Sequence, residues 1–326
     1  MTQGQRFADG AAHGKVILLG EHAAIYGAPA LAFPIPALTC RVTVRQSAAS
    51  GDPASRLYRV SPGPQGAAKE AVSNVPAEFL LLLAAFAEQA GLDAPPAMDI
   101  RLDSRVPPSR GLGSSAANAR ALARALDAFF AVGMDEPSTY DLVQVSERSA
   151  HGMASGIDAL ATGSEHPVLL THARPRTPLV GADLHLVVID SGSGAGTRRA
   201  VEMLRDTFAQ HPEERTRFVH RSTALTEAAL ADMAAGCLSP LGQHLNDCHA
   251  MLAALGLTTN RTDALVHMAL DAGALGAKMT GGGLGGCVVA LTRTAAQAAS
   301  VASTLTDRAG VQTWITTTRR AQHDRP

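Results

Sequence analysis

The sequence predicts an α+β protein with two domains, and three observations support this prediction. The chain has 326 residues, 46% hydrophobic and 17% charged, which is enough apolar material for one large core or two medium ones. Strand-like and helix-like segments occur in both halves, which differs from the pattern of a helical bundle or a β-sandwich. No repeat of fixed period appears. Two domains is therefore the default interpretation.

The N-terminal region is expected to contain two strands. Residues 38–45 alternate apolar and polar side chains, as a half-buried strand does, and residues 15–19, KVILL, also indicate a strand. Gly27, Pro29, Pro34 and Pro36 lie between these segments and predict a loop with short turns. Residues 47–66 are rich in Ser, Gly and Pro, so they predict an exposed, mobile connection.

Helices dominate the next part of the first half. Pro76 suits the start of a helix, strong helix formers follow it, and Gly91 ends the segment. Residues 98–106 alternate in the manner of a half-buried strand. Helix-forming residues predict two more helices, at 114–130 and 139–151.

The second half begins with the apolar stretch 183–192, which predicts a buried strand. Four helices are expected after it, at 197–210, 213–235, 239–255 and 261–272. Two strands are expected at 286–292 and 311–318, with a helix at 294–308 between them.

Composition excludes several classes of function. The net charge of −1 provides no basic surplus for nucleic acid or anionic lipid. The apolar run 79–87 is too short to span a bilayer, and the N-terminus lacks a hydrophobic signal segment, so we expect a cytoplasmic protein. Histidines 244 and 249 are expected on a helix face rather than at a metal. The four cysteines lack CxxC spacing and are expected to be core residues: Cys40, Cys237, Cys248 and Cys287.

A glycine-rich segment, PPSRGLGSSAA at 107–117, lies between a predicted strand and a predicted helix. It satisfies neither the Walker pattern nor the Rossmann pattern, in which Ala116 would be a glycine. Glycines let backbone N–H groups turn inward, and a helix N-terminus favours an anion. Taken alone, the segment is better explained by Ser114 or Ser115 as an ordinary helix N-cap.

Two other segments favour anion binding over an ordinary helix N-cap. GKVILLGEHAAIYGAPALA at 14–32 carries Lys15, Glu21 and His22. KMTGGGLGG at 278–286 places five glycines in six positions before a strand. The chain has only three lysines, and two of them lie in these segments.

Together and in this order, the three segments resemble the three motifs of the GHMP small-molecule kinases, and the resemblance covers nearly the whole chain. Within that superfamily, residues 20–32 and 147–160 are most similar to the mevalonate kinases. A galactokinase is expected to show an acidic residue and a tyrosine after GEH. His13 and Ala154 stand where the family usually has proline, which puts loop rigidity and substrate preference in question.

The resemblance implies an N-terminal domain similar to ribosomal protein S5 over residues 1–180. It implies a ferredoxin-like C-terminal domain over residues 181–326, with the active site in the groove between the two. The implied reaction transfers the γ-phosphoryl group of ATP to the primary 5-hydroxyl of (R)-mevalonate, giving 5-phosphomevalonate for isoprenoid synthesis. A small-molecule substrate is implied, without nucleic acid or membrane, and a homodimer is compatible with this interpretation.

Two alternatives stay open. Another kinase of this superfamily could act on phosphomevalonate or on a different hydroxyl of mevalonate, but no extra basic cluster is evident near Lys15 or Asp158. A catalytically silent relative could bind a nucleotide or metabolite, but such proteins generally lose the base or the metal ligand.

The resemblance also assigns catalytic roles. Asp158 would accept the hydroxyl proton, and Lys15 would stabilise the charges of Asp158 and of the attacking oxygen. Glu147 and Ser115 would bind Mg²⁺. Taken singly, Asp158 would be a helix N-cap, Lys15 a solvated charge and Glu147 an exposed helix residue.

Binding roles follow in the same way. The resemblance assigns the phosphates of ATP to Pro108, Gly111, Leu112, Gly113, Ser114, Ser115 and Ala116. It assigns the substrate to Glu21, His22, Thr197, Arg198, Gly282 and Gly283. Only glycine would let the backbone at 281–286 approach the ligands closely, although a flexible turn is the simpler interpretation of that segment alone.

Overall fold

The structure is a computed structural model, and it describes residues 6–46, 59–62, 76–93, 98–171, 174–194 and 197–320. It contains two compact units that interleave along the chain. The first unit comprises residues 1–14, 38–107 and 113–163, and the second comprises residues 15–37, 108–112 and 164–326. The predicted boundary between domains near residue 180 stays a prediction.

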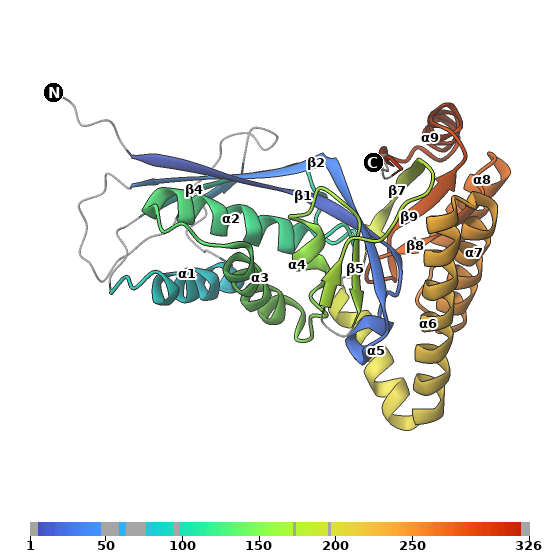
Figure 1. Cartoon of the computed structure of the whole chain (residues 1–326), viewed down its shortest axis with the longest axis horizontal. Coiled ribbons are helices and arrows are strands. Elements are labelled where there is room, and N and C mark those ends of the chain that lie inside the picture. Colours follow the sequence, from blue (N-terminus) through green and yellow to red (C-terminus); the bar gives the residue numbers. More distant parts are fainter. Residues whose placement is uncertain are drawn as a thin grey trace, which may run out of the picture. The chain divides into compact units, whose positions relative to one another are not determined.

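The first unit combines strands with helices on one side of them (Figure 1). Its strands are parts of β1 (Phe7–Leu19) and β2 (Ala30–Gln46), together with β3 (Arg59–Pro62) and β4 (Met98–Ser104). Residues 40–46 of β2 pair antiparallel with β4, and β3 runs parallel to β4. The helices are α1 (Ala77–Gln89), α2 (Ser114–Phe130), α3 (Glu136–His151) and α4 (Ile157–Ala161).

The second unit has a four-stranded antiparallel sheet in the order β10-β7-β9-β8. These strands are β7 (Leu184–Gly194), β8 (Gly276–Thr280), β9 (Gly285–Thr292) and β10 (Thr313–Thr318). Residues 30–32 of β2 pair with β5 (Val168–Thr171), which pairs with β6 (Arg174–Arg176).

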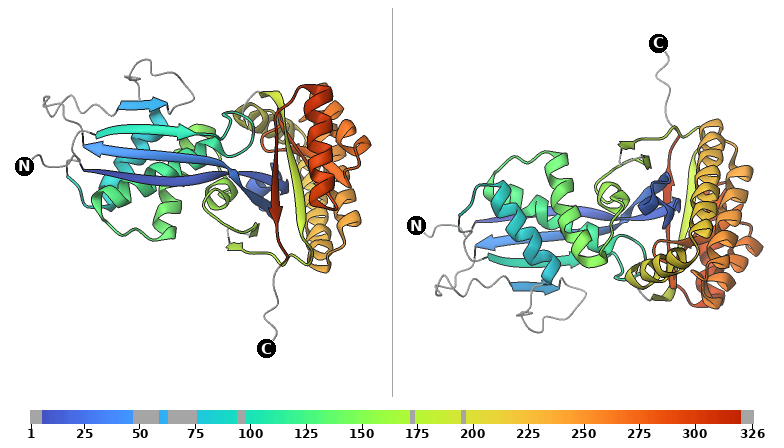
Figure 2. Two further views of the ribbon diagram at one scale, coloured as in Figure 1. Left: turned by 90° about the horizontal axis from the view of Figure 1, so that it is seen from above. Right: turned by 90° about the horizontal axis from the view of Figure 1, so that it is seen from below.

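Helices cover one face of the four-stranded sheet (Figure 2). They are α7 (Leu238–Ala254), α8 (Asn260–Asp271) and α9 (Ala295–Ala309), with α6 (Pro212–Ala235) packed against α7. The unit also contains α5 (Thr197–Gln210) and the short 3₁₀ helix η1 (Ala23–Tyr26).

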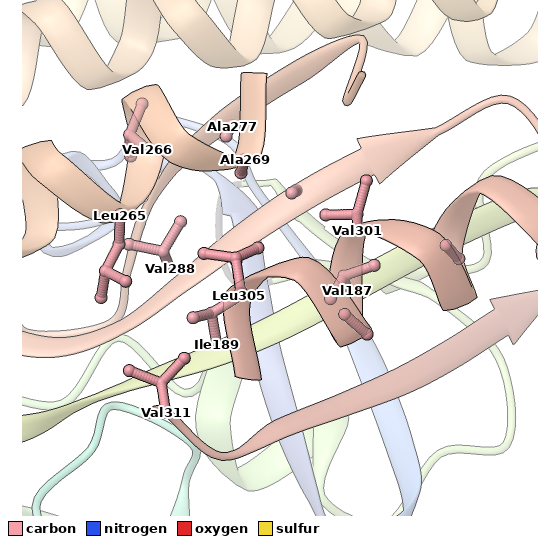
Figure 3. Packing of buried hydrophobic residues seen from close by; sticks show 13 residues of the cluster. Val187, Ile189, Leu265, Val266, Ala269, Ala277, Val288, Val301, Leu305 and Val311 are labelled. Atoms are coloured by element: carbon pink, nitrogen blue, oxygen red, sulfur yellow. The ribbon is translucent and has the colours of Figure 1, made fainter. Parts of the chain in front are cut away.

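A layer of aliphatic side chains joins this sheet to its helices (Figure 3). Val187 and Ile189 of β7 are two residues apart and therefore point to the same face of the sheet. They pack with Val288 of β9, Leu265 of α8 and Leu305 of α9, all fully buried. Each such side chain contributes about 1.5–3 kcal/mol on burial, so the cluster fixes the sheet on which the site described below is built.

The α+β class predicted from the sequence is confirmed, with strands and helices in both units. Helix α2 occupies the predicted residues 114–130, and α5 the predicted residues 197–210. Helix α3 begins at Glu136, earlier than predicted, because the Asp135 side chain accepts a hydrogen bond from Ser138 N at 2.9 Å and caps it.

The loop predicted between the first two strands is wrong for residues 30–37, which belong to β2. Pro34 and Pro36 are tolerated because they lie between the residues that pair with β5 and those that pair with β4. A missing N–H there breaks neither ladder. The connection predicted at 47–66 lies outside the described residues except for residues 59–62, which form β3.

The cysteine prediction is wrong at one position. Cys40, Cys248 and Cys287 are buried as predicted, but Cys237 is exposed, immediately before α7. Among the described residues, no helix combines the length and apolarity that crossing a bilayer requires.

Candidate active site

Lys15 of β1 is buried and contacts the glycine-rich segment at 108–112. Its Nζ donates to Gly111 O at 3.1 Å, and its backbone N donates to Leu112 O at 3.0 Å. The side chain is only 1% exposed, so the interpretation of Lys15 as a solvated charge is wrong. Lysine is almost never fully buried without a partner, which sets this position apart from ordinary surface lysines.

Two of the predicted glycine segments meet in the second unit. Gly111 and Gly281 have φ values of +75° and +79°, which favour glycine. A Cβ on Gly111 would lie 2.8 Å from Thr280 O and 3.0 Å from Gly281 Cα. The two backbones therefore touch where neither can carry a side chain, and residues 281–282 form a turn that packs against Gly111.

Glu21 and Lys278 form a buried ion pair beside this glycine turn. Their side chains are 1% and 0% exposed, and Lys278 Nζ also donates to Met279 O at 2.6 Å. Burial raises the pKa of the Glu21 carboxyl, and the Lys278 ammonium opposes that shift. Lys278 thus compensates for a carboxylate that would otherwise be costly to bury.

His22 follows Glu21 and has a strained backbone. Its φ is +58°, uncommon for a residue with a side chain, and it precedes η1. Burial, together with the positive charge of Lys278, lowers the pKa of the His22 imidazole to about 4, so the ring is neutral at pH 7. Strained residues of this kind gather at functional sites.

Two polar atoms of this cluster are buried without a bonding partner. Among the described residues, neither Glu21 Oε2 nor His22 Nε2 has a hydrogen-bond partner. Leaving a buried polar atom unsatisfied costs about 1–3 kcal/mol, so each such atom calls for an explanation. A polar ligand that bonds to both atoms would remove this cost.

Thr197 lies next to the glycine turn, as its predicted role requires. It is the first residue of α5, and a Cβ on Gly282 would lie 2.6 Å from Thr197 Oγ1. A Cβ on Gly283 would lie 2.7 Å from Leu257 O. Arg198 is exposed on α5.

The first unit contains the other predicted group of functional residues. Ser115 lies in the first turn of α2, and Glu147 is buried on α3. Both contact the His151 ring: Ser115 Oγ is 3.2 Å from Nε2, and Glu147 Oε2 is 3.8 Å from the same atom. The hydroxyl and the carboxylate therefore approach one point, and the interpretation of Glu147 as an exposed helix residue is wrong.

This convergence fits a magnesium ion. Mg²⁺ prefers oxygen ligands and commonly takes one or two from the protein, the rest being waters and phosphate oxygens. One buried carboxylate and one hydroxyl supply that set. Within the described part of the chain, no group of three or more His, Cys, Asp or Glu side chains forms a metal cage, and Mg²⁺ bound with a nucleotide does not need one.

The helix starts differ from the simple capping interpretations. Gly113, with φ +72°, occupies the N-cap of α2, and Ser114 Oγ donates to Val106 O at 3.3 Å instead of capping the helix. Gly156, with φ +91°, occupies the N-cap of α4, so Asp158 lies inside the first turn. Neither serine nor Asp158 is a helix cap.

Two residues that were not predicted as site residues belong to these clusters: His151, which contacts Ser115 and Glu147, and Lys278, which pairs with Glu21. The spacing of His151 four residues after Glu147 on one helix was an available signal. Lys278 was noticeable as one of only three lysines. Lys15 belongs to the second unit and Asp158 to the first, and their pairing stays a prediction.

Comparisons with known proteins identify the family. Residues 77–165 match the family described as GHMP kinases N terminal domain, and residues 229–311 match GHMP kinases C terminal. A mevalonate kinase of Aeropyrum pernix is 34% identical over 299 residues, covering 88% of this chain and 89% of that protein. One from Pyrococcus horikoshii is 31% identical, with coverage of 85% and 86%.

A solved structure has the same fold. The crystal structure of L. major mevalonate kinase in complex with R-mevalonate has a TM-score of 0.78 at 23% identity, covering 99% of this chain and 98% of that one. The predicted two-domain α+β fold is thereby confirmed. With both family matches, relatives above 30% identity along most of the chain and the glycine segments in contact, the protein belongs to the GHMP kinase family.

Proposed function

We propose that this chain transfers the γ-phosphoryl group of ATP to the primary 5-hydroxyl of (R)-mevalonate, giving 5-phosphomevalonate. The observation that carries the proposal is the pair of buried, unpartnered atoms Glu21 Oε2 and His22 Nε2 beside the glycine turn. A polyhydroxylated substrate satisfies both, because one hydroxyl can donate to Glu21 Oε2 while a second hydroxyl donates to or accepts from His22 Nε2. The relatives named mevalonate kinase support the choice of mevalonate.

The proposed chemistry needs a base because an alcohol is a very weak acid. Water, with a pKa of about 15.7, resembles the substrate hydroxyl, whereas a carboxyl has a pKa of about 3.9. Asp158 therefore accepts the proton only as the new O–P bond forms and the bond from phosphorus to the ADP oxygen breaks. Such general-base help contributes about 10² to 10⁴ in rate, and alignment and electrostatics supply the larger share.

Lys15 and the backbone of the glycine segments supply the positive potential in this proposal. Lys15 holds Gly111 in place and contributes a buried positive charge where phosphate charge must be stabilised. Ser115 and Glu147 would hold Mg²⁺, which would supply neutralisation of phosphate charge when bound with ATP. Thr197 and Arg198 contact the substrate carboxylate or the transferred group.

A direct assay tests the substrate. Purified protein is incubated with ATP, Mg²⁺ and either (R)-mevalonate or 5-phosphomevalonate, and ADP release is measured. The proposal expects kcat/KM for mevalonate to exceed that for phosphomevalonate by at least about 100-fold, since a phosphorylated substrate needs a further anion pocket. A preference for phosphomevalonate would replace mevalonate with its phosphorylated relative.

The role of Asp158 is tested by Asp158→Asn, which keeps the size of the side chain and removes the base. The proposal expects kcat to fall by about 10²-fold or more, while the Kd for ATP changes less than about twofold. Asp141→Asn on α3 is a matched control, because Asp141 is exposed. Normal turnover in Asp158→Asn would remove this residue from the chemistry.

A further inference from the structure

The segment at 109–111 contacts a distorted part of β7. The register of β7 against β9 shifts between Asp190 and Gly194, which marks a β-bulge or a similar irregularity. Bulges of this kind often lie next to active sites, where they redirect side chains. The bulge carries Asp190 and the Gly192 carbonyl, and Arg110 contacts both.

Arg110 bonds to this bulge at two points. Its Nε donates to Asp190 Oδ2 at 3.2 Å and lies 2.8 Å from Oδ1, and its Nη2 donates to Gly192 O at 3.0 Å. Asp190 Oδ1 accepts from Gly192 N at 2.8 Å, so the carboxylate is also held by its own strand. The Arg110 and Asp190 side chains are 23% and 12% exposed, which limits the screening of the pair by solvent.

Glycines let this segment approach β7 and β9 directly. A Cβ on Gly194 would overlap Ser109 O, and a Cβ on Gly286 would lie 3.0 Å from Arg110 O. Gly111 meets Gly281 on its other side. The backbone at 109–111 therefore packs directly against the backbone of Gly194, Gly281 and Gly286. Arg110, which carries the only long side chain of this segment, points to the bulge.

We propose that Arg110 is a positioning residue for nucleotide binding, which acts by holding the backbone at 109–111 on the β7 bulge through Asp190 and Gly192. The inference rests on the proposed binding of ATP phosphates by this segment. Backbone N–H groups select an anion only when their directions are fixed in advance, and the Arg110 contacts supply that fixation. Arg110 itself does not need to touch the nucleotide.

Three variants test this inference: Arg110→Ala, Asp190→Asn and the double variant. Binding of the fluorescent analogue mant-ATP with Mg²⁺ is measured without any acceptor, so the test stands even if the acceptor is not mevalonate. Each single variant is expected to raise the Kd about 10-fold, which corresponds to the loss of about one charge-assisted hydrogen bond. The double variant is expected to lie within about twofold of Arg110→Ala, because both single changes disrupt the same Arg110–Asp190 ion pair.

Arg205→Ala is the matched control, since Arg205 forms an exposed pair with its neighbour Asp206 on α5. It is expected to leave the Kd unchanged. A loss of binding in Arg110→Ala alone, with Asp190→Asn normal, would show that the contact with Asp190 does not position the segment and would overturn the proposed role. Single effects that multiply in the double variant, or a lower Tm with an unchanged Kd, would overturn it as well.

Discussion

Lys278 Nζ donates to Glu21 Oε1 across 257 residues of sequence, and neither side chain is open to solvent. This contact joins the segment after β1 to β8, immediately before the glycine turn. A buried ion pair is weak evidence for stability, because desolvation offsets much of the attraction. The pair matters because it fixes the positions of Glu21 and of its neighbour His22.

The first prediction concerns the stability of this pair. Glu21→Gln or Lys278→Met alone leaves one buried charge without compensation, so each is expected to lower the free energy of unfolding by about 3–5 kcal/mol. The double variant is expected to lose clearly less than the sum. Urea unfolding measures all three, and Asp206→Asn at the exposed pair on α5 serves as control. Additive losses would contradict a coupled pair.

The second prediction is a pH dependence caused by His22. Its pKa is about 4 in the folded protein against 6.5 for the free side chain. The unfolded chain therefore binds more protons between these values, so the stability contribution of His22 is present above about pH 6.5 and is lost as the pH falls toward 4. Lowering the pH from 7 to 5 is expected to cost about 2 kcal/mol through this group.

The contribution of His22 is isolated by comparison with His22→Asn, since asparagine tolerates a positive φ. The difference in free energy of unfolding between wild type and variant is measured at pH 7 and pH 5. Burial raises the pKa of Glu21, which acts in the opposite direction but is common to both proteins. His220→Asn on α6, an exposed position, controls for histidine removal as such. A difference that is the same at both pH values would contradict the prediction.

The third prediction separates close packing from backbone strain at glycine. Gly281 and Gly133 have almost the same φ, +79° and +78°, but a Cβ on Gly281 would overlap Gly111 Cα while one on Gly133 meets nothing within 4 Å. Both alanine variants pay the strain of about 1–2 kcal/mol. Only Gly281→Ala should also displace the segment at 109–111.

We therefore expect Gly281→Ala to weaken mant-ATP binding by about 10-fold or more, and Gly133→Ala to bind normally while losing some thermal stability. Nucleotide titration and thermal unfolding of both proteins provide the test. Equal binding by the two variants would show that the glycine contact has no part in nucleotide recognition.

The fourth prediction concerns thiol reactivity. Burial raises the pKa of Cys40 and of Cys248 to about 12 and raises that of Cys287 as well, whereas Cys237 is exposed. Because the thiolate is the reactive form, DTNB should label one thiol per native chain and four after unfolding in urea. Cys237→Ser should abolish the native reaction. Labelling of a second thiol in native Cys237→Ser would disagree with the burial of the other three.

Much of the secondary structure was predictable because its causes are local. The helices at 114–130 and 197–210 follow from helix-forming residues that lie within the segments themselves. The three glycine segments were recognisable for the same reason, because positions that need a positive φ are usually occupied by glycine. The predicted loop failed at residues 30–37 because residues 30–32 pair with β5 and residues 40–46 pair with β4, and this pairing on both sides of Pro34 and Pro36 outweighs the local effect of the prolines.

By itself, the sequence determined the fold class, the glycine-rich backbone and the residue types available for phosphoryl transfer. Tertiary structure decided which charges meet: Lys278 with Glu21, and Arg110 with Asp190. These partners are 257 and 80 residues apart, so no local pattern encodes their pairing. A side chain's conformational preference is set by its neighbours in sequence, whereas its ion-pair partner is set by the packing of strands and helices that brings distant segments together.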